Sequence, residues 1–169
     1  MAAKNRGRQG LALGRSRRER GPRRSVIYLD TSCLLKLLLE EPESEAVRMA
    51  VAGESEVIVS ALTELETAVR LRAGWLGGEY RERRYRAYVG RLNVFRDTDP
   101  FRFRPLAGSL FQTALRQERE ARRVHCRTLD RLHLAAMEEL GLGRLMTTDT
   151  AEAAGAKALG FEVVSPGRR

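Results

Sequence analysis

The chain has only two cysteines, Cys33 and Cys126, among its 169 residues. They form no CxxC pair, so the sequence offers neither a zinc ribbon nor a dithiol redox motif. Cys33 lies within an apolar run, which is typical of a small buried hydrophobic residue. We therefore expect both thiols to be free, as suits a protein of the reducing cytoplasm.

Long hydrophobic runs are also missing. No stretch of about 18 apolar residues occurs, which excludes a transmembrane helix, and we expect no membrane partner. The first residues lack the apolar core of about 7–15 residues that a signal peptide requires. The motifs GxxxxGK[ST] and GxSxG are absent, so neither a P-loop nucleotide site nor an α/β-hydrolase nucleophile is predicted.

Acidic residues are scarce at the start of the chain. Residues 1–24 hold nine basic residues and one acidic residue, whereas residues 25–169 hold 22 basic and 21 acidic residues. The net charge of +9 therefore belongs almost entirely to the first segment. Because that segment has too few apolar residues to fold alone, we expect a basic flexible tail, 1–24, and one domain, 25–169. A phosphate-binding arm, an inert tail and residues added by an upstream start codon are open interpretations of 1–24.

Predicted strands and helices alternate along the domain. The β-rich runs are 26–29, 57–59, 92–95, 145–148 and 161–164. The helical segments are 31–40, 43–52, 61–76, 79–91, 105–121, 128–140 and 150–159. This alternation is typical of an α/β domain, here a three-layer α/β/α arrangement with a mainly parallel central sheet of four or five strands.

Two aspartates directly follow predicted strands. Asp30 comes after the strand at 26–29, and Asp149 after the strand at 145–148. Sites in parallel sheets lie beyond the carboxyl ends of the strands, so parallel strands would bring both carboxylates to one edge. Each aspartate taken alone is explained as well by a helix N-cap.

A third aspartate, Asp130, lies near the start of the predicted helix 128–140. We expect Thr128 to be the N-cap of this helix, which leaves Asp130 free for other work. His133 lies on the same helical face three residues later. For His133 a packed, hydrogen-bonded ring is favoured over a metal ligand.

The helix predicted at 61–76 contributes Glu64 and Glu66. Both flank its apolar arc, so periodicity does not choose between them. Several carboxylates at one point repel one another unless a cation lies among them. Oxygen ligands favour Mg²⁺ or Mn²⁺ over zinc, and a metal-bound water can attack phosphorus. The residues by themselves therefore indicate hydrolysis of a phosphate ester.

The order and spacing of five sequence blocks resemble the PIN domain family, specifically the VapC-type toxin ribonucleases of bacterial toxin–antitoxin pairs. The blocks are YLDTSCLLKLLLEEP, VIVSALTELETAV, RTLDRLHLAA, LMTTD and ALGFEVV, and they span about Val26 to Val164. Each block alone is unspecific, and their succession makes the resemblance.

The resemblance implies four acids that are both catalytic and metal-binding: Asp30, Glu66, Asp130 and Asp149. The family's glutamate stands six residues after the serine of an SxL block, which gives Glu66, although the leucine that often follows it stands after Glu64 here. Ser32 and Thr147 match hydroxyl positions that orient water or a carboxylate in such sites.

The implied activity is an endoribonuclease that depends on Mg²⁺ or Mn²⁺ and leaves 5′-phosphate and 3′-hydroxyl ends on its RNA substrate. The resemblance also implies a homodimer and a VapB-type antitoxin that blocks the site. Two alternatives are a non-catalytic PIN-like module for RNA binding or assembly, and a DNA flap endonuclease, for which 169 residues leave little room.

Basic and apolar residues near these motifs suggest partner contacts. Arg127 and Arg131 could meet RNA phosphates near the metal, or belong to a solvated charged face. Tyrosines among the arginines of 79–91 could stack on bases, but a helix with a tyrosine-edged core face is favoured. The leucine-rich segment 31–40 is either buried on two sides or meets a partner.

Overall fold

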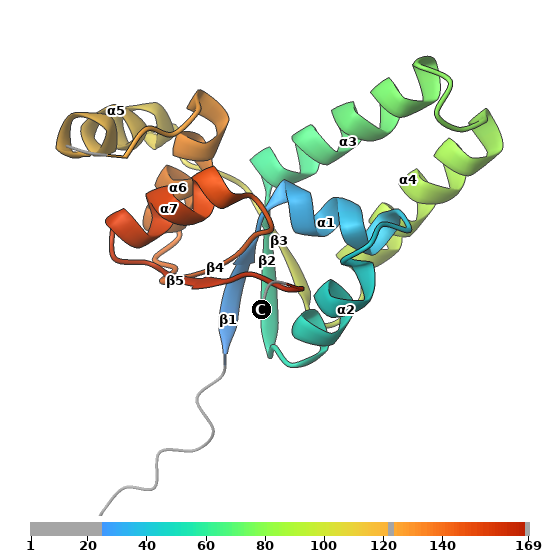
Figure 1. Cartoon of the computed structure of the whole chain (residues 1–169), viewed down its shortest axis with the longest axis horizontal. Helices are drawn as coiled ribbons and strands as arrows, with labels where there is room; N and C mark the ends of the chain where they lie inside the picture. Colours follow the sequence, from blue (N-terminus) through green and yellow to red (C-terminus); the bar gives the residue numbers. More distant parts are fainter. Residues whose placement is uncertain (1–24, 122–123, 168–169) are drawn as a thin grey trace, which may run out of the picture.

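Five parallel strands form the central sheet in the order β3-β2-β1-β4-β5 (Figure 1). The strands are β1 (Val26–Leu29), β2 (Glu56–Ser60), β3 (Phe101–Arg104), β4 (Arg144–Met146) and β5 (Glu162–Val164). The computed structural model describes residues 25–121 and 124–167. The tail predicted at 1–24 lies outside the described residues. Within the described ranges, no helix has the length and hydropathy needed to cross a membrane.

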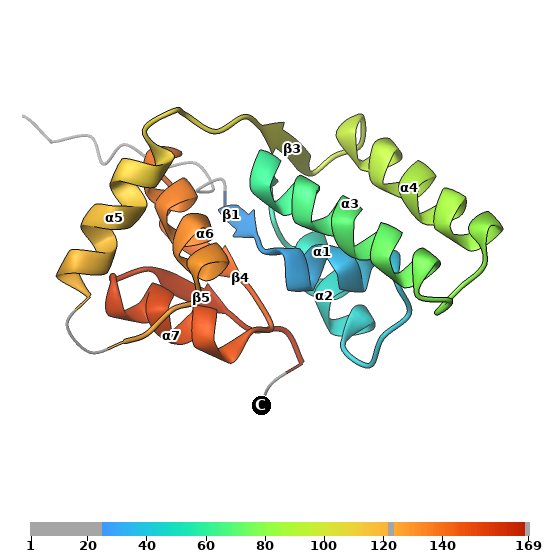
Figure 2. The same ribbon diagram turned by 90° about the horizontal axis from the view of Figure 1, so that it is seen from above.

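Seven helices in the described ranges cover the two faces of the sheet. They are α1 (Thr31–Leu38), α2 (Ser44–Ala52), α3 (Ala61–Leu76), α4 (Glu82–Arg96), α5 (Leu110–Glu120), α6 (Thr128–Glu139) and α7 (Thr150–Ala158). Helices α1 to α4 lie on one side of the sheet and α5 to α7 on the other (Figure 2). The predicted three-layer α/β/α architecture is therefore confirmed.

Strand β1 shows how the sequence builds two cores. Side chains alternate across a strand, so Ile27 and Leu29 enter the core with α1, α2 and α4, while Tyr28 enters the core with α5, α6 and α7. A strand buried on both faces needs a continuous apolar run, as VIYL provides. The ends of β1 and β4 lie together because Leu29 pairs with Met146.

One predicted strand is wrong. Residues 92–95 belong to helix α4, and the third strand is Phe101–Arg104. Tyr85, Tyr88, Val89 and Leu92 recur at helical spacing and pack on the core, which the short apolar run LNVF concealed. The FRFR strand is an edge strand with exposed arginines, so its apolar content is low.

Two other expectations are confirmed, and one open alternative is favoured. Tyr85 and Tyr88 face the core, as the favoured interpretation of their helix predicted. In α1, Leu34, Leu37 and Leu38 are buried and the remaining leucines pack beside them, so the helix is buried on two sides. Both cysteines are buried and free.

Candidate active site

Asp30 and Asp149 stand at the carboxyl ends of the neighbouring strands β1 and β4, and each is also an N-cap. Asp30 accepts hydrogen bonds from the backbone N–H groups of Thr31 (2.5 Å) and Ser32 (3.1 Å) at the start of α1. Asp149 accepts them from Ala151 (2.8 Å) and Glu152 (3.2 Å) at the start of α7. The capping and sheet-edge interpretations are therefore both correct. Two helix N-termini stabilise the two negative charges at one place.

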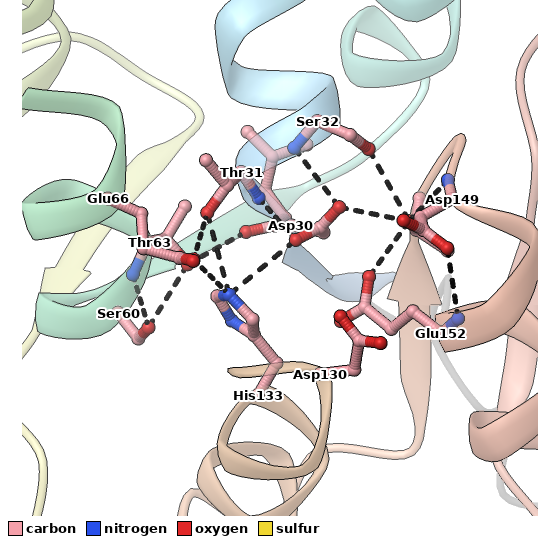
Figure 3. A network of polar contacts seen from close by, with 12 residues as sticks. Asp30, Thr31, Ser32, Ser60, Thr63, Glu66, Asp130, His133, Asp149 and Glu152 are labelled. Carbon is pink, nitrogen blue, oxygen red and sulfur yellow. Dashed lines mark hydrogen bonds and ion pairs between the residues drawn. The ribbon is translucent and has the colours of Figure 1, made fainter. Parts of the chain in front are cut away.

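Hydroxyl groups connect Asp30 to the end of β4 (Figure 3). Thr147 Oγ1 donates to Asp30 Oδ2 at 3.0 Å. Ser32 Oγ accepts from the Thr148 backbone N–H at 3.1 Å and lies 3.4 Å from Thr147 Oγ1. Ser32 and Thr147 are thus at the site. The Thr147 hydroxyl and the Ser32 backbone N–H orient the carboxylate of the buried Asp30, and the Ser32 hydroxyl links α1 to the end of β4.

Glu66 reaches the site from α3, whereas Glu64 does not. Glu66 Oε2 accepts from Thr31 Oγ1 at 2.6 Å and lies 2.5 Å from His133 Nε2. Glu64 pairs with Arg96 of α4 on the outer side. Burial alone would raise the pKa of Glu66, but the hydrogen bonds from His133 and Thr31 and the charge of Arg127 lower it, so Glu66 is ionised.

His133 lies between two acids and a buried phenol. Its Nε2 is 2.5 Å from Glu66 and 3.6 Å from Asp30 Oδ1, and its Nδ1 is 2.7 Å from the Tyr28 hydroxyl. Burial raises the pKa of Tyr28, so the hydroxyl keeps its proton and can donate it to Nδ1. Both ring nitrogens of His133 therefore have a hydrogen-bond partner, the Tyr28 hydroxyl at Nδ1 and Glu66 at Nε2. The ring is packed and hydrogen-bonded as expected, and its ligand atom also lies close enough to those of Asp30 and Glu152 to help hold a cation.

Asp130 is not left free by its helix. The N-cap of α6 is Arg127 rather than Thr128, and Asp130 Oδ2 accepts from the Arg127 backbone N–H at 3.1 Å in a capping box. The Arg127 guanidinium also contacts both Asp130 (3.0 Å) and Asp149 (2.5 Å). Burial would raise the pKa of Asp149, but backbone N–H groups of Glu152 and Ala151, together with Arg127, lower it.

The two predicted phosphate-binding arginines have different surroundings. The side chain of Arg127 is 64% exposed, so it can reach a ligand in solvent. That of Arg131 is 6% exposed and pairs with Glu118 of α5 at 3.1 Å. Arg131 therefore lies between α5 and α6 and presents no open guanidinium to a phosphate.

Sequence reasoning missed Glu152. This residue of α7 is 1% exposed, and its Oε2 is 2.9 Å from Thr147 Oγ1. Its Oε1 has no hydrogen-bond partner among the described residues. Burial and the nearby charge of Asp30 raise the pKa of Glu152 well above its ordinary value. The available signal was its position on the same face of the helix as the small residues Gly155 and Ala156, which are three and four residues later.

One group of ligand atoms is close enough to hold a cation. Atoms of Asp30, His133 and Glu152 all lie within 4.8 Å of one another. Glu66 adjoins this group through His133, and Asp130 lies beside Glu152 (Figure 3). Buried carboxylate oxygens, one of them unpartnered, form a donor set that suits a divalent cation.

Comparisons with known proteins identify the family and the fold of the chain. The PIN domain family model matches residues 27–158. Ribonuclease VapC46 of Mycobacterium tuberculosis is 35% identical over 144 residues, which cover 84% of this chain and 98% of the relative. The crystal structure of VapC20 from the same species, described as a sarcin-ricin loop cleaving toxin, has a TM-score of 0.62 at 20% identity and covers 83% and 99% of the two chains. A toxin–antitoxin complex from Klebsiella pneumoniae has a TM-score of 0.56 at 17% identity and covers 85% and 99%.

Proposed function

The chain belongs to the PIN domain family, and from this membership we propose that it is a metal-dependent endoribonuclease, the VapC-type toxin of a toxin–antitoxin pair. One observation supports this most strongly. Acids from four separate elements, the ends of β1 and β4 and the helices α3 and α6, meet at one edge of the sheet. Arg127 offsets part of the repulsion between Asp130 and Asp149, and a divalent cation would offset the repulsion that remains among the acids.

We assign Asp30, Glu66, Asp130 and Asp149 to hold Mg²⁺ or Mn²⁺, as the family resemblance implies. Among the described residues, Asp30 is the member of this set that also belongs to the close group with His133 and Glu152. When bound, the ion supplies a water of lowered pKa and a positive charge for the developing oxyanion. The protein keeps the ligands ready. Backbone N–H groups and Thr147 orient Asp30, and Thr31 and His133 orient Glu66. The lowered pKa values of Glu66 and Asp149 favour the ionised carboxylates that can bind a cation and accept protons.

The test is cleavage of labelled RNA with Mn²⁺ by the wild type and by Asp30→Asn. Asparagine also accepts N–H bonds at an N-cap, so the fold should survive. We expect a loss of at least about 100-fold in rate, as for other groups that stabilise developing charge. Asp97→Asn, an exposed position at the end of α4, is the matched control and should cut normally. The fragments should have 5′-phosphate and 3′-hydroxyl ends.

Two results would contradict the proposal. If folded Asp30→Asn cuts like the wild type, Asp30 is not a catalytic residue. If folded, metal-binding wild type cuts none of a varied set of RNAs, the alternative of a non-catalytic RNA-binding or assembly module is favoured.

We further propose a VapB-type antitoxin and a second copy of the chain as partners, acting in the cytoplasm. Exposed apolar side chains support protein contacts, namely Leu65 and Val69 on α3 and Phe111 and Leu115 on α5. The free thiols suit a reducing compartment. The mass in solution by light scattering tests the dimer, and inhibition of cleavage by a co-expressed antitoxin tests the second partner.

A further inference from the structure

The positive charge of the domain is concentrated in one helical hairpin, which we call the arm and define as residues 61–96. The arm holds eight arginines and four acidic residues, a net charge of +4. The remainder of 25–169 holds 14 basic and 17 acidic residues, a net charge of −3. The near-neutral total of the domain therefore conceals a strong charge asymmetry.

The arm projects from the body of the molecule. Helices α3 and α4 run side by side away from the sheet (Figures 1 and 2). Aromatic side chains fill the space between them, since Trp75 stacks on Tyr85 at 4.9 Å and the Tyr80 hydroxyl donates to the Leu71 carbonyl at 2.6 Å. Gly74 permits this approach, because a Cβ there would lie 2.6 Å from the Tyr80 hydroxyl. The arm is thus a packed, preorganised structure.

All eight arginines of the arm are exposed. They are Arg70, Arg72, Arg81, Arg83, Arg84, Arg86, Arg91 and Arg96. Among the described residues, only Arg86 and Arg96 have an ion pair, with Glu82 and Glu64. Arg81, Arg83 and Arg84 line one surface hollow together with Tyr80. Tyr85 and Tyr88 pack on the core while the arginine side chains are exposed, so positive charge dominates this surface and a negatively charged ligand fits it.

The arm begins at the catalytic site. Glu66 lies in the second turn of α3, and the helix continues to Leu76. Ten residues at about 1.5 Å each give roughly 15 Å, which is the length of several nucleotides. A strand of RNA with one phosphate at the acids could therefore place its flanking phosphates along the arm.

We propose that the arm binds the phosphate backbone of the RNA next to the cleavage position. The proposal rests on the proposed ribonuclease function. Guanidinium groups bind phosphate through paired hydrogen bonds, and every basic residue of the arm is an arginine. The basic arm starts on the same helix that carries Glu66, which favours nucleic acid over an acidic protein segment as its ligand.

The test uses a variant with Arg81→Gln, Arg83→Gln and Arg84→Gln, since glutamine keeps helix propensity. The matched control has the same three charges removed elsewhere, as Arg48→Gln, Arg102→Gln and Arg119→Gln. Binding of a fluorescent single-stranded RNA of mixed sequence is measured with a chelator present, from 50 to 300 mM salt. Each lost phosphate contact lowers the log–log salt slope by about 0.7 for single strands.

We expect the arm variant to bind at least about tenfold more weakly than the control variant, with a salt slope smaller by about 2. Affinity and slope equal to those of the control would overturn the proposal. So would unchanged RNA binding combined with lost binding of poly-glutamate, which would assign the arm to an acidic protein. RNA cleavage by the wild type separates the two proposals. If the wild type cuts RNA but the arm variant binds RNA as well as the control variant does, the ribonuclease proposal stands and only the proposed role of the arm is contradicted.

Discussion

Arg127 Nη2 lies 2.5 Å from Asp149 Oδ2, and the same nitrogen lies 3.0 Å from Asp130 Oδ1. One guanidinium thus bridges two acids that come from different elements. Any cation that binds both acids must compete with this positive charge. Arg127 is exposed enough to turn toward solvent, so the competition is reversible.

Arg127→Ala should therefore tighten Mn²⁺ binding. Exposed ion pairs contribute up to about 1 kcal/mol each, so removal of the two contacts predicts a decrease in Kd of roughly 3- to 10-fold. Isothermal titration calorimetry of each protein with Mn²⁺ measures this Kd. Arg119→Ala on α5 removes the same charge from an exposed position away from the acids and should leave the Kd unchanged. Equal or weaker binding by the Arg127 variant would contradict the competition.

The two glutamates of α3 form a matched pair two residues apart. Glu66→Gln should reduce the rate of RNA cleavage at least about 100-fold, because the charged partner of Thr31 and His133 is lost. Glu64→Gln removes only an exposed ion pair with Arg96 and should cost less than about 1 kcal/mol of stability with near-normal cleavage. The rate of RNA cleavage under single-turnover conditions with Mn²⁺ is measured for both variants. Equal losses in the two variants would show that the orientation of α3 does not select Glu66.

Glu152 predicts a pH dependence of stability. Its pKa is raised in the folded state by burial and by Asp30, so the folded protein keeps a proton that the unfolded chain releases above its ordinary pKa. The stability of the metal-free protein should therefore fall as pH rises from this ordinary value toward the raised one, by at most about 1.4 kcal/mol per pH unit.

Glu152→Gln cannot ionise and should be more stable than the wild type near pH 7, with the difference vanishing near pH 4. Urea unfolding between pH 4 and 8 with a chelator present measures both profiles. Glu79→Gln, at an exposed position of the arm, should follow the wild type at every pH. Parallel profiles for the wild type and Glu152→Gln would refute the assigned cause.

Two helical glycines should respond to alanine in opposite directions. In α7 the Cβ of Gly155→Ala would collide with Cys126 Sγ and press on Leu134, so we expect a loss of about 1–3 kcal/mol. In α4 nothing lies within 4 Å of the Cβ that Gly90→Ala would add, so we expect this variant to gain about 0.5–1 kcal/mol in the free energy of unfolding. The free energies of unfolding in urea compare the two directly. A stabilised Gly155→Ala would mean that α7 shifts freely on α6.

Local sequence determined much of this protein. The run VIYL must be buried on both faces, and the aspartate that follows it can cap the next helix, so the strand, the turn and Asp30 follow from neighbouring residues. The same logic predicts Asp149 after LMTT. The alternation of strands and helices likewise predicts the α/β class, since helices must cover both faces of a parallel sheet.

Only the tertiary structure decided which side chains meet. The pairing of β1 with β4 brings Asp30 beside Asp149, and the rotation of α3 selects Glu66 over Glu64. Helical periodicity shows which side of a helix is apolar, but it does not fix how the helix is rotated about its axis relative to the site. Residues on both edges of the apolar side satisfy the pattern equally. For the same reason the sequence did not reveal Glu152, whose carboxyl is buried where α7 packs on α6 and β5 and meets Thr147 at the end of β4.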